Sequence, residues 1–126
     1  MAKQAIHTPA APAALGTYSQ GILAGKTLYL SGQLGLDPVT GNLRDTIEAQ
    51  IDQAFQNLRA VAAAAGASLD DAVKLTLFLT DLANFAKVNE TMARYFKQPY
   101  PARSTVQVSA LPKNAGFEVE AVIVLP

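Results

Sequence analysis

The chain has 126 residues, of which 50% are hydrophobic and 16% are charged, and its ten basic residues balance ten acidic ones. This size and composition predict one packed domain over residues 1–126 and exclude a disordered chain. Because the net charge is zero and no basic block occurs, the electrostatic footprint of a nucleic-acid-binding protein is missing. We therefore expect no nucleic-acid partner.

The sequence contains no cysteine and a single histidine, His7. It excludes disulfide bonds, thiolate catalysis and cysteine-ligated metals, and it leaves no histidine cluster for zinc or haem, so we predict neither a metal nor a cofactor. No stretch approaches the roughly 18 apolar residues of a membrane span, and no long apolar run follows Lys3. We expect a soluble, cytoplasmic protein without a membrane partner, with an organelle as the alternative compartment.

Extended segments and turn residues alternate in the first third of the chain. A short extended piece at residues 3–7 is followed by "TPAAPAALG", which is typical of a proline-punctuated loop. Residues 18–23 and 27–34 are predicted strands joined through Gly25. The segment "LDPVTGNL" then has the composition of a turn.

The hydrophobic period changes at Asp45. Apolar residues now recur every three or four positions, which predicts one buried face of a helix, formed by Ile47, Ile51, Phe55, Leu58, Ala62 and Ala65. Asp45 is the predicted N-cap, with Glu48 three residues later, and Gly66 is the predicted stop.

The second half of the chain contains the remaining strands and one more helix. Residues 72–80 alternate in polarity and predict a strand with one apolar face, formed by Val73, Leu75, Leu77 and Leu79. A helix is predicted over residues 84–96. Two strands, "STVQVSA" and "FEVEAVIVL", close the chain. The element order is β-β-β-α-β-α-β-β, with neither an internal repeat nor a low-complexity tract.

Two helices can cover only one face of such a sheet. The opposite face also carries apolar side chains, with Phe78, Val122 and Val124 as its expected members. Apolar surface of this kind has to be buried against another element or another molecule. A second copy of the chain is the simplest partner, so we predict a homo-oligomer.

The candidates for chemistry lie in the last two strands. Arg103, Thr105 and Gln107 share one face of their strand, and Glu118 and Glu120 share one face of theirs, because sheet positions repeat every second residue. If the two strands are antiparallel neighbours, the arginine and the glutamates meet. A structural salt bridge and a functional site both explain this pattern.

Several longer blocks resemble one family over nearly the whole chain and in the same order. These blocks are "TYSQG", "LYLSGQLGLDPVTGNL", "DLANFAKVNETMARYF" and "PARSTVQVSALPKNAGFEVEAVIV". They are similar to the RidA/YjgF family of reactive-intermediate (enamine/imine) deaminases. The resemblance implies a chorismate-mutase-like α+β domain with a mixed sheet and two helices on one face. It also implies a homotrimer whose active sites lie in the clefts between subunits.

The resemblance also implies roles for individual residues. Arg103 stands at the position of the arginine that binds the substrate carboxylate, and Glu118 at that of the glutamate associated with the attacking water. Tyr18 would close the cleft or hydrogen-bond the leaving nitrogen. The remaining substrate-binding positions are Ser31, Gly32, Asn89 and Thr105.

Two residues depart from the family pattern. Thr17 replaces the proline that commonly precedes the tyrosine, which leaves the approach to Tyr18 less rigid. Thr105 stands where many members carry a cysteine. Threonine serves equally well there if the position contributes its backbone amide, whereas a role for the thiol would make this protein weaker or differently selective.

The implied activity is the hydrolysis of small 2-imino acids and their enamine tautomers, such as 2-aminoacrylate and 2-iminopropanoate, to 2-oxo acids and ammonia. A non-catalytic module that binds small carboxylates, or a chaperone-like protein, would use the same arginine and is the first alternative. A ribonuclease that inhibits translation is a weaker one, because the chain has no basic stripe. Chorismate mutase activity is a further alternative, but only the implied fold supports it, and a shared fold is weak evidence for function.

Overall fold

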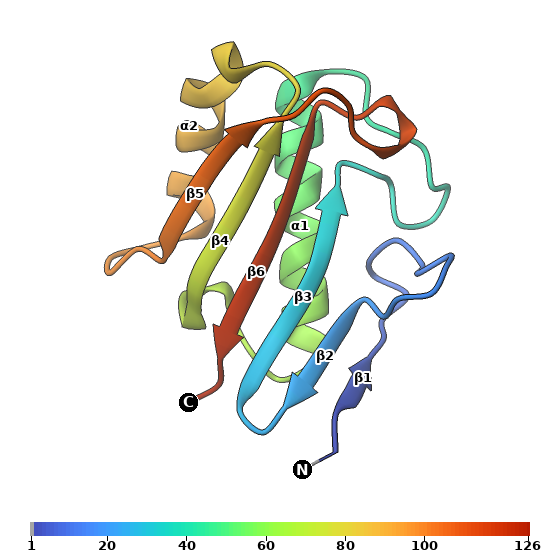
Figure 1. Cartoon of the computed structure of the whole chain (residues 1–126), viewed down its shortest axis with the longest axis vertical. Coiled ribbons are helices and arrows are strands. Elements are labelled where there is room, and N and C mark those ends of the chain that lie inside the picture. Colours follow the sequence, from blue (N-terminus) through green and yellow to red (C-terminus); the bar gives the residue numbers. More distant parts are fainter. Residues whose placement is uncertain (1) are drawn as a thin grey trace.

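A computed structural model describes residues 2–126, which build a six-stranded sheet. In spatial order the strands are β1 (Gln4–Ile6), β2 (Gly21–Ala24), β3 (Thr27–Leu34), β6 (Phe117–Val124), β4 (Ala72–Leu79) and β5 (Ala102–Gln107) (Figure 1). All neighbouring strands are antiparallel except β4 and β5, which are parallel. The sheet is therefore mixed, as the family resemblance implied.

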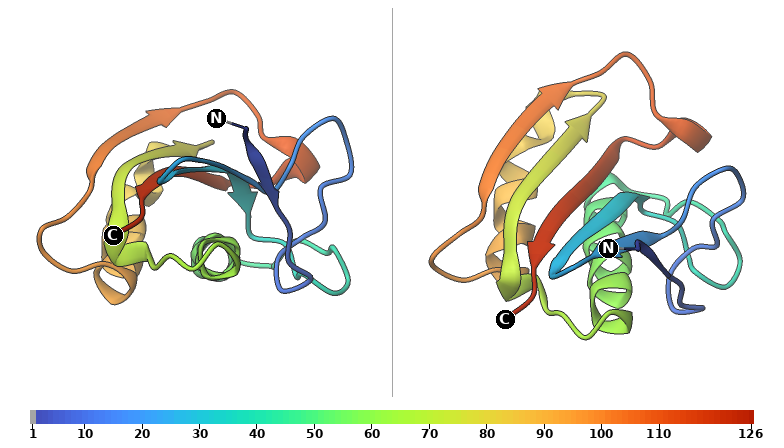
Figure 2. Two further views of the ribbon diagram at one scale, coloured as in Figure 1. Left: turned by 90° about the horizontal axis from the view of Figure 1, so that it is seen from below. Right: turned by 60° about the horizontal axis from the view of Figure 1, so that its bottom comes forward.

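Both α-helices lie on the same face of this sheet, as Figure 2 shows. They are α1 (Ile47–Ala64) and α2 (Phe85–Tyr95), and three single 3-10 turns accompany them: η1 (Leu69–Asp71), η2 (Leu82–Asn84) and η3 (Pro112–Asn114). Within residues 2–126, no helix combines the length and apolar character needed to cross a bilayer. The predicted α+β architecture and element order are confirmed.

Helix α1 forms the centre of the core. Its predicted apolar face is correct, since Ile51, Phe55 and Leu58 are completely buried against the sheet. The predicted N-cap, Asp45, is wrong, because Thr46 caps the helix by accepting a hydrogen bond of 3.1 Å from the amide of Ala49. Asp45 precedes the cap and lies in the exposed approach to the helix.

Strand β4 carries the core on one face, with one exception to the prediction. Leu75, Leu77 and Leu79 are fully buried, but Val73 is not part of this face. The pairing of β4 with β6 shifts register between Ala72 and Lys74, and this irregularity leaves Ala72 8% exposed and Val73 47% exposed. A bulge breaks the two-residue alternation on which the prediction depended.

Strand β2 begins at Gly21 instead of Tyr18, and the preceding residues pair in another way. The amide of Ser31 donates a 3.0 Å hydrogen bond to the carbonyl of Gln20, and the Ser31 hydroxyl donates to the carbonyl of Ser19. In the same region the register of β3 against β6 shifts between Leu30 and Gln33. Tyr18 therefore lies in a loop beside an irregular part of β3.

The face of the sheet opposite the helices carries large apolar side chains that remain accessible. Register places Val106 beside Phe78 and Tyr29 beside Val122, while Val124 follows near the end of β6. Tyr29 is 52% exposed, and Val106 and Val124 are 42% and 44% exposed. This open face is the surface on which the sequence-based prediction of a homo-oligomer depends, and the oligomer itself stays a prediction.

Candidate functional site

Four of the candidate residues line one groove, of about 740 Å³, at the β3–β6 side of the sheet. The loop between β1 and β2 contributes Tyr18, β3 contributes Ser31 and Gly32, and β6 contributes Glu118. The loop that follows β3 forms the opposite wall, with Pro38, Val39, Thr40 and Gly41 among its lining residues. Side chains separated by about a hundred positions in sequence thus share one surface.

Gly32 makes room for the carboxylate of Glu118. A Cβ atom on residue 32 would lie 2.7 Å from a Glu118 carboxylate oxygen and 2.8 Å from its carboxyl carbon. Any larger residue would displace this side chain from its position on the groove. Burial raises the pKa of Glu118 above its ordinary value, and the negative charge of Glu120 raises it further. Both causes disfavour the ionised form.

The loop that carries Tyr18 is fixed by a buried side chain, Gln20, which is 2% exposed. Its amide oxygen accepts a 2.7 Å hydrogen bond from the amide of Thr8, and its amide nitrogen donates to the carbonyls of Thr8 and Pro12 at 3.0 and 2.8 Å. Sequence analysis missed this residue, because one glutamine before a strand carries no periodic signal. Tyr18 itself is 56% exposed at the rim.

Arg103 and Asn89 lie together at the β5 edge of the sheet, outside the groove. Nη1 of Arg103 donates a 2.7 Å hydrogen bond to Oδ1 of Asn89 and contacts the sulfur of Met92 at 3.4 Å. The guanidinium carbon lies 5.1 Å from the centre of the Phe85 ring. Among residues 2–126, Nε and Nη2 make no hydrogen bond, so two donors are available to a carboxylate. A hollow of about 340 Å³ adjoins this group.

Arg103 and Glu118 do not meet within one chain, because their strands are not neighbours and the condition for their meeting is not fulfilled. Strand β4 lies between β5 and β6. Arg103 pairs with Leu75, on the helix-covered face, whereas Glu118 pairs with Phe78, on the open face. The cause is the crossover through α2, which adds β5 parallel to β4 on the far side from β6. The predicted structural salt bridge is absent from the ion pairs of residues 2–126.

Thr105 shares the face of Arg103, since its partner in β4 is Leu77. Its hydroxyl oxygen is buried and has no hydrogen-bond partner among the described residues. An orphaned buried hydroxyl costs about 1–3 kcal/mol. A ligand or a second copy that supplied a partner here would recover part of that cost.

A metal site is not apparent in the part of the chain that the structure describes. Residues 2–126 contain no group of three or more His, Asp or Glu side chains placed to hold an ion. The groups available for chemistry are a guanidinium at the β5 edge, and a carboxylate with a phenol and a hydroxyl in the groove at β3 and β6.

A mixed sheet with two helices on one face, and with a groove lined by a carboxylate at β3 and β6, defines a small α+β domain with a candidate binding groove. The family model described as "Endoribonuclease L-PSP" matches residues 8–125. The chain therefore belongs to this family, the RidA/YjgF family.

Several known proteins and solved structures are similar to this chain over nearly its whole length. The chain is 46% identical to the 2-iminobutanoate/2-iminopropanoate deaminase of Dermatophagoides farinae, over 98% of this chain and 97% of that protein. It superimposes with a TM-score of 0.95 on RidA from an Antarctic Psychrobacter, at 50% identity, covering 97% of this chain and 99% of that one. E. coli TdcF with bound serine gives a TM-score of 0.93 at 38% identity, covering 98% and 99%.

Proposed function

We propose that this chain is an enamine/imine deaminase, which hydrolyses small 2-imino acids and their enamine tautomers to 2-oxo acids and ammonia. Relatives named as deaminases of this type support the assignment, at 46% identity for the mite protein. The proposed residue roles rest on two separate groups, which we call half-sites. One is the Arg103 guanidinium with its free donors, and the other is the partly buried Glu118 carboxylate on the groove. A related protein holds serine, which shares the 2-nitrogen and the carboxylate of these substrates.

Arg103 binds the substrate carboxylate in this proposal. A planar guanidinium matches a carboxylate through two parallel hydrogen bonds, which orients the adjacent imine carbon. Each such charge-assisted bond contributes about 1.5–3 kcal/mol. Asn89 accepts a hydrogen bond from Nη1 and so holds the guanidinium in one orientation. Ser31, Gly32 and Thr105 complete the substrate-binding set.

Glu118 acts as the general base toward water. The protonated imine carbon is already electrophilic, so water attacks it while Glu118 takes one proton, and a carbon–oxygen bond forms as the C=N π bond breaks. Glu118 then returns the proton to the nitrogen of the resulting carbinolamine, and the carbon–nitrogen bond breaks to release ammonia. The hydroxyl proton passes to the regenerated Glu118 carboxylate as the carbonyl of the 2-oxo acid forms. A raised pKa suits both transfers, because it brings the base nearer to neutral pH. Tyr18, on the groove rim, closes the pocket or hydrogen-bonds the departing nitrogen in this proposal.

The two half-sites form one active site between copies of the chain. Arg103 and Glu118 lie on opposite faces and on strands separated by β4, so one small substrate cannot contact both within a chain. A ring in which the Arg103 edge of one copy meets the groove of the next gives every copy the same contact. The family resemblance makes this ring a homotrimer. In this proposal residues 1–126 form one domain. The proposed compartment is the cytoplasm, which cell fractionation tests.

The test is the rate of 2-oxo acid formation while a serine dehydratase generates 2-aminoacrylate. We expect the wild-type chain to accelerate this step beyond spontaneous decay, and Arg103→Ala to abolish the acceleration. Arg94→Ala is the matched control, because Arg94 is exposed on α2 and pairs with Asp52 outside both half-sites. No acceleration by the wild type would sink the deaminase proposal for this substrate.

Glu118→Gln separates the enzyme from a carboxylate-binding or chaperone-like module. A hydrolase should lose turnover in this variant and keep its affinity for a 2-oxo acid, because Arg103 remains. A binding module needs only the arginine. Equal turnover in Glu118→Gln and wild type would remove Glu118 from the mechanism. Retained affinity is measured by calorimetric titration with pyruvate.

A further inference from the structure

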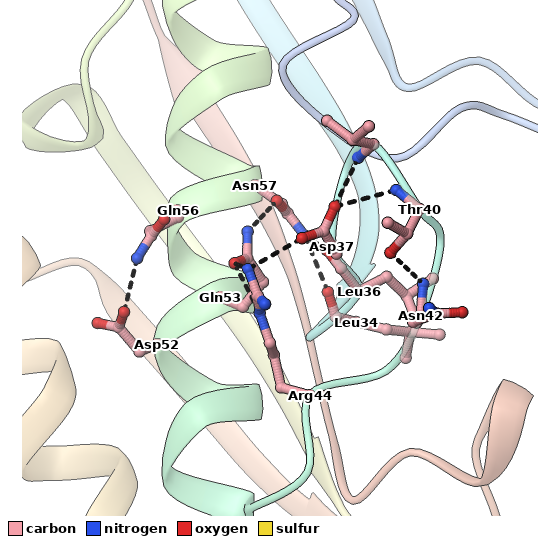
Figure 3. Close-up of polar contacts among 11 residues, drawn as sticks. Leu34, Leu36, Asp37, Thr40, Asn42, Arg44, Asp52, Gln53, Gln56 and Asn57 are labelled. Carbon is pink, nitrogen blue, oxygen red and sulfur yellow. Dashed lines mark hydrogen bonds and ion pairs between the residues drawn. The ribbon is translucent and has the colours of Figure 1, made fainter.

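Helix α1 buries three amide side chains in one row, Gln50, Gln53 and Asn57, which are 8%, 6% and 0% exposed. We call this row the amide stripe. Buried amides are costly unless they are hydrogen-bonded, and positions three and four apart share a helix face. None of the three residues is used by the proposed mechanism, although Gln53 and Asn57 bond segments next to the groove (Figure 3).

Gln50 holds the segment that leads into Glu118. Its amide oxygen accepts a 2.8 Å hydrogen bond from the amide of Gly116, and its amide nitrogen donates to the carbonyl of Arg44 at 3.1 Å. Gly116 lies two residues before Glu118. The end of β3 packs against the same point, because a Cβ on Gly35 would lie 2.4 Å from the Gln50 Cα. Gln50 therefore ties β6, the β3 exit and α1 together.

Asn57 holds the start of the opposite wall. Its amide nitrogen donates to the carbonyls of Leu34 and Leu36 at 3.1 and 2.9 Å, and both of these residues line the groove. The Asn57 oxygen accepts a 2.8 Å hydrogen bond from Gln53. Leu34 is the last residue of β3, and its carbonyl also accepts a 2.8 Å hydrogen bond from the amide of Leu36. Asn57 therefore bonds the chain at the point where it leaves the sheet (Figure 3).

Arg44 extends the network to the tip of this wall. Its Nε and Nη2 donate to Oε1 of Gln53 at 3.2 and 2.9 Å, and Nη2 pairs with Oδ2 of Asp37 at 3.2 Å. The other oxygen of Asp37 accepts hydrogen bonds from the amides of Val39 and Thr40, at 2.8 and 3.0 Å. Val39 and Thr40 line the groove.

We propose that the amide stripe is a positioning device for the groove. Gln50 sets the place of Glu118, whereas Asn57 directly, and Gln53 through Arg44, set the wall of residues 34–41. The part that concerns turnover rests on the proposed function, in which Glu118 is the base. The two branches make different predictions. The Gln50 branch controls a reacting group and so controls kcat, whereas the Arg44 branch controls a wall that only contacts the substrate and so controls KM.

The Gln50 branch is tested with Gln50→Met, which preserves volume and removes both hydrogen bonds. Gln56→Met is the control, since Gln56 lies on the exposed side of the same helix, donates to Asp52 and does not line the groove. We expect kcat to fall about tenfold with KM within about twofold. Equal kcat in the two variants would overturn the role of Gln50.

A second measurement does not depend on enzymatic activity. The carboxyl carbon NMR signal of Glu118 is recorded against pH to give its pKa, and Glu118→Gln assigns the signal. The titratable side chains around it on the groove are Tyr18, Lys113 and Glu120. In Gln50→Met, looser anchoring should let water reach the carboxyl group and lower its pKa toward the ordinary value. An unchanged titration would overturn the inference. An inactive wild type would reject only the proposed function, because this readout still decides the positioning role.

The wall branch is tested with Arg44→Met, a partly exposed position where the fold tolerates change, against Arg94→Met on α2. We expect KM to rise about fivefold with kcat nearly unchanged in Arg44→Met alone. A matching loss of kcat and thermal stability, with KM unchanged, would show ordinary destabilisation and overturn this branch. The Arg44 variant also decides the proposal if Gln50→Met fails to fold.

Discussion

At the scale of one residue, the surroundings of Glu118, the proposed general base, lower the stability of the fold near neutral pH. Its carboxyl group is partly buried beside Gly32 and Glu120, and these surroundings raise its pKa. The unfolded chain has no such bias, so it releases the proton at lower pH. Between the two pKa values the folded state holds more protons than the unfolded state, and the free energy of unfolding falls as the pH rises.

Glu118→Gln should therefore stabilise the protein near neutral pH while it removes turnover. The amide resembles the protonated carboxyl group, so the variant avoids the cost of ionisation at every pH. We expect a higher melting temperature than wild type at about pH 7 and equal melting temperatures at about pH 4, where both states of the wild type are protonated. Thermal melts at the two values measure this. A constant difference across the range would point to packing instead of charge.

At the scale of elements, hydrophobic periodicity predicted most of the buried faces. It could not predict the bulge in β4 or the position of β5 in the sheet. The faces of α1 and most of β4 follow directly from spacing. Val73 was placed wrongly because a bulge has no signature in an alternating sequence. The position of β5 beside β4 could not be predicted, since the crossover through α2 permits either side of the existing strands. The sequence pattern within single elements consequently could not predict that Arg103 and Glu118 lie on separate strands and opposite faces of the sheet.

The amide stripe and the choice of helix cap are two further features that the sequence pattern alone could not predict. Gln50, Gln53 and Asn57 look like solvated helix positions in sequence, and only the chain segments packed over them make them buried. Asp45 and Thr46 are both good N-cap residues. The structure selects Thr46 because the helical backbone starts at residue 47.

This cap gives a stability prediction with an internal control. Thr46→Ala should lower the free energy of unfolding by about 1 kcal/mol, because the amide of Ala49 loses its side-chain acceptor. Asp45→Ala should change it by less than about 0.5 kcal/mol, since Asp45 makes no cap. Urea denaturation measures both. A larger loss in the Asp45 variant would restore it as the cap.

At the scale of the whole molecule, the sheet separates the two groups that the proposed reaction needs. One chain presents a guanidinium on the helix-covered face at the β5 edge, and a carboxylate on the open face within the groove. The open face also leaves apolar side chains exposed, including Tyr29 and Val124. A closed ring that joins unlike edges would bury this surface and complete every site at once.

Two inactive variants should therefore restore each other. Arg103→Ala and Glu118→Gln are coexpressed with different tags, and tandem purification selects rings that contain both. Any mixed ring of three has one contact in which an intact Arg103 meets an intact Glu118, so about a third of wild-type activity should return. Each variant coexpressed with a differently tagged copy of itself provides the control and should stay inactive. A site contained within one chain cannot be rescued in this way, so mixed rings as inactive as the controls would rule out the shared site.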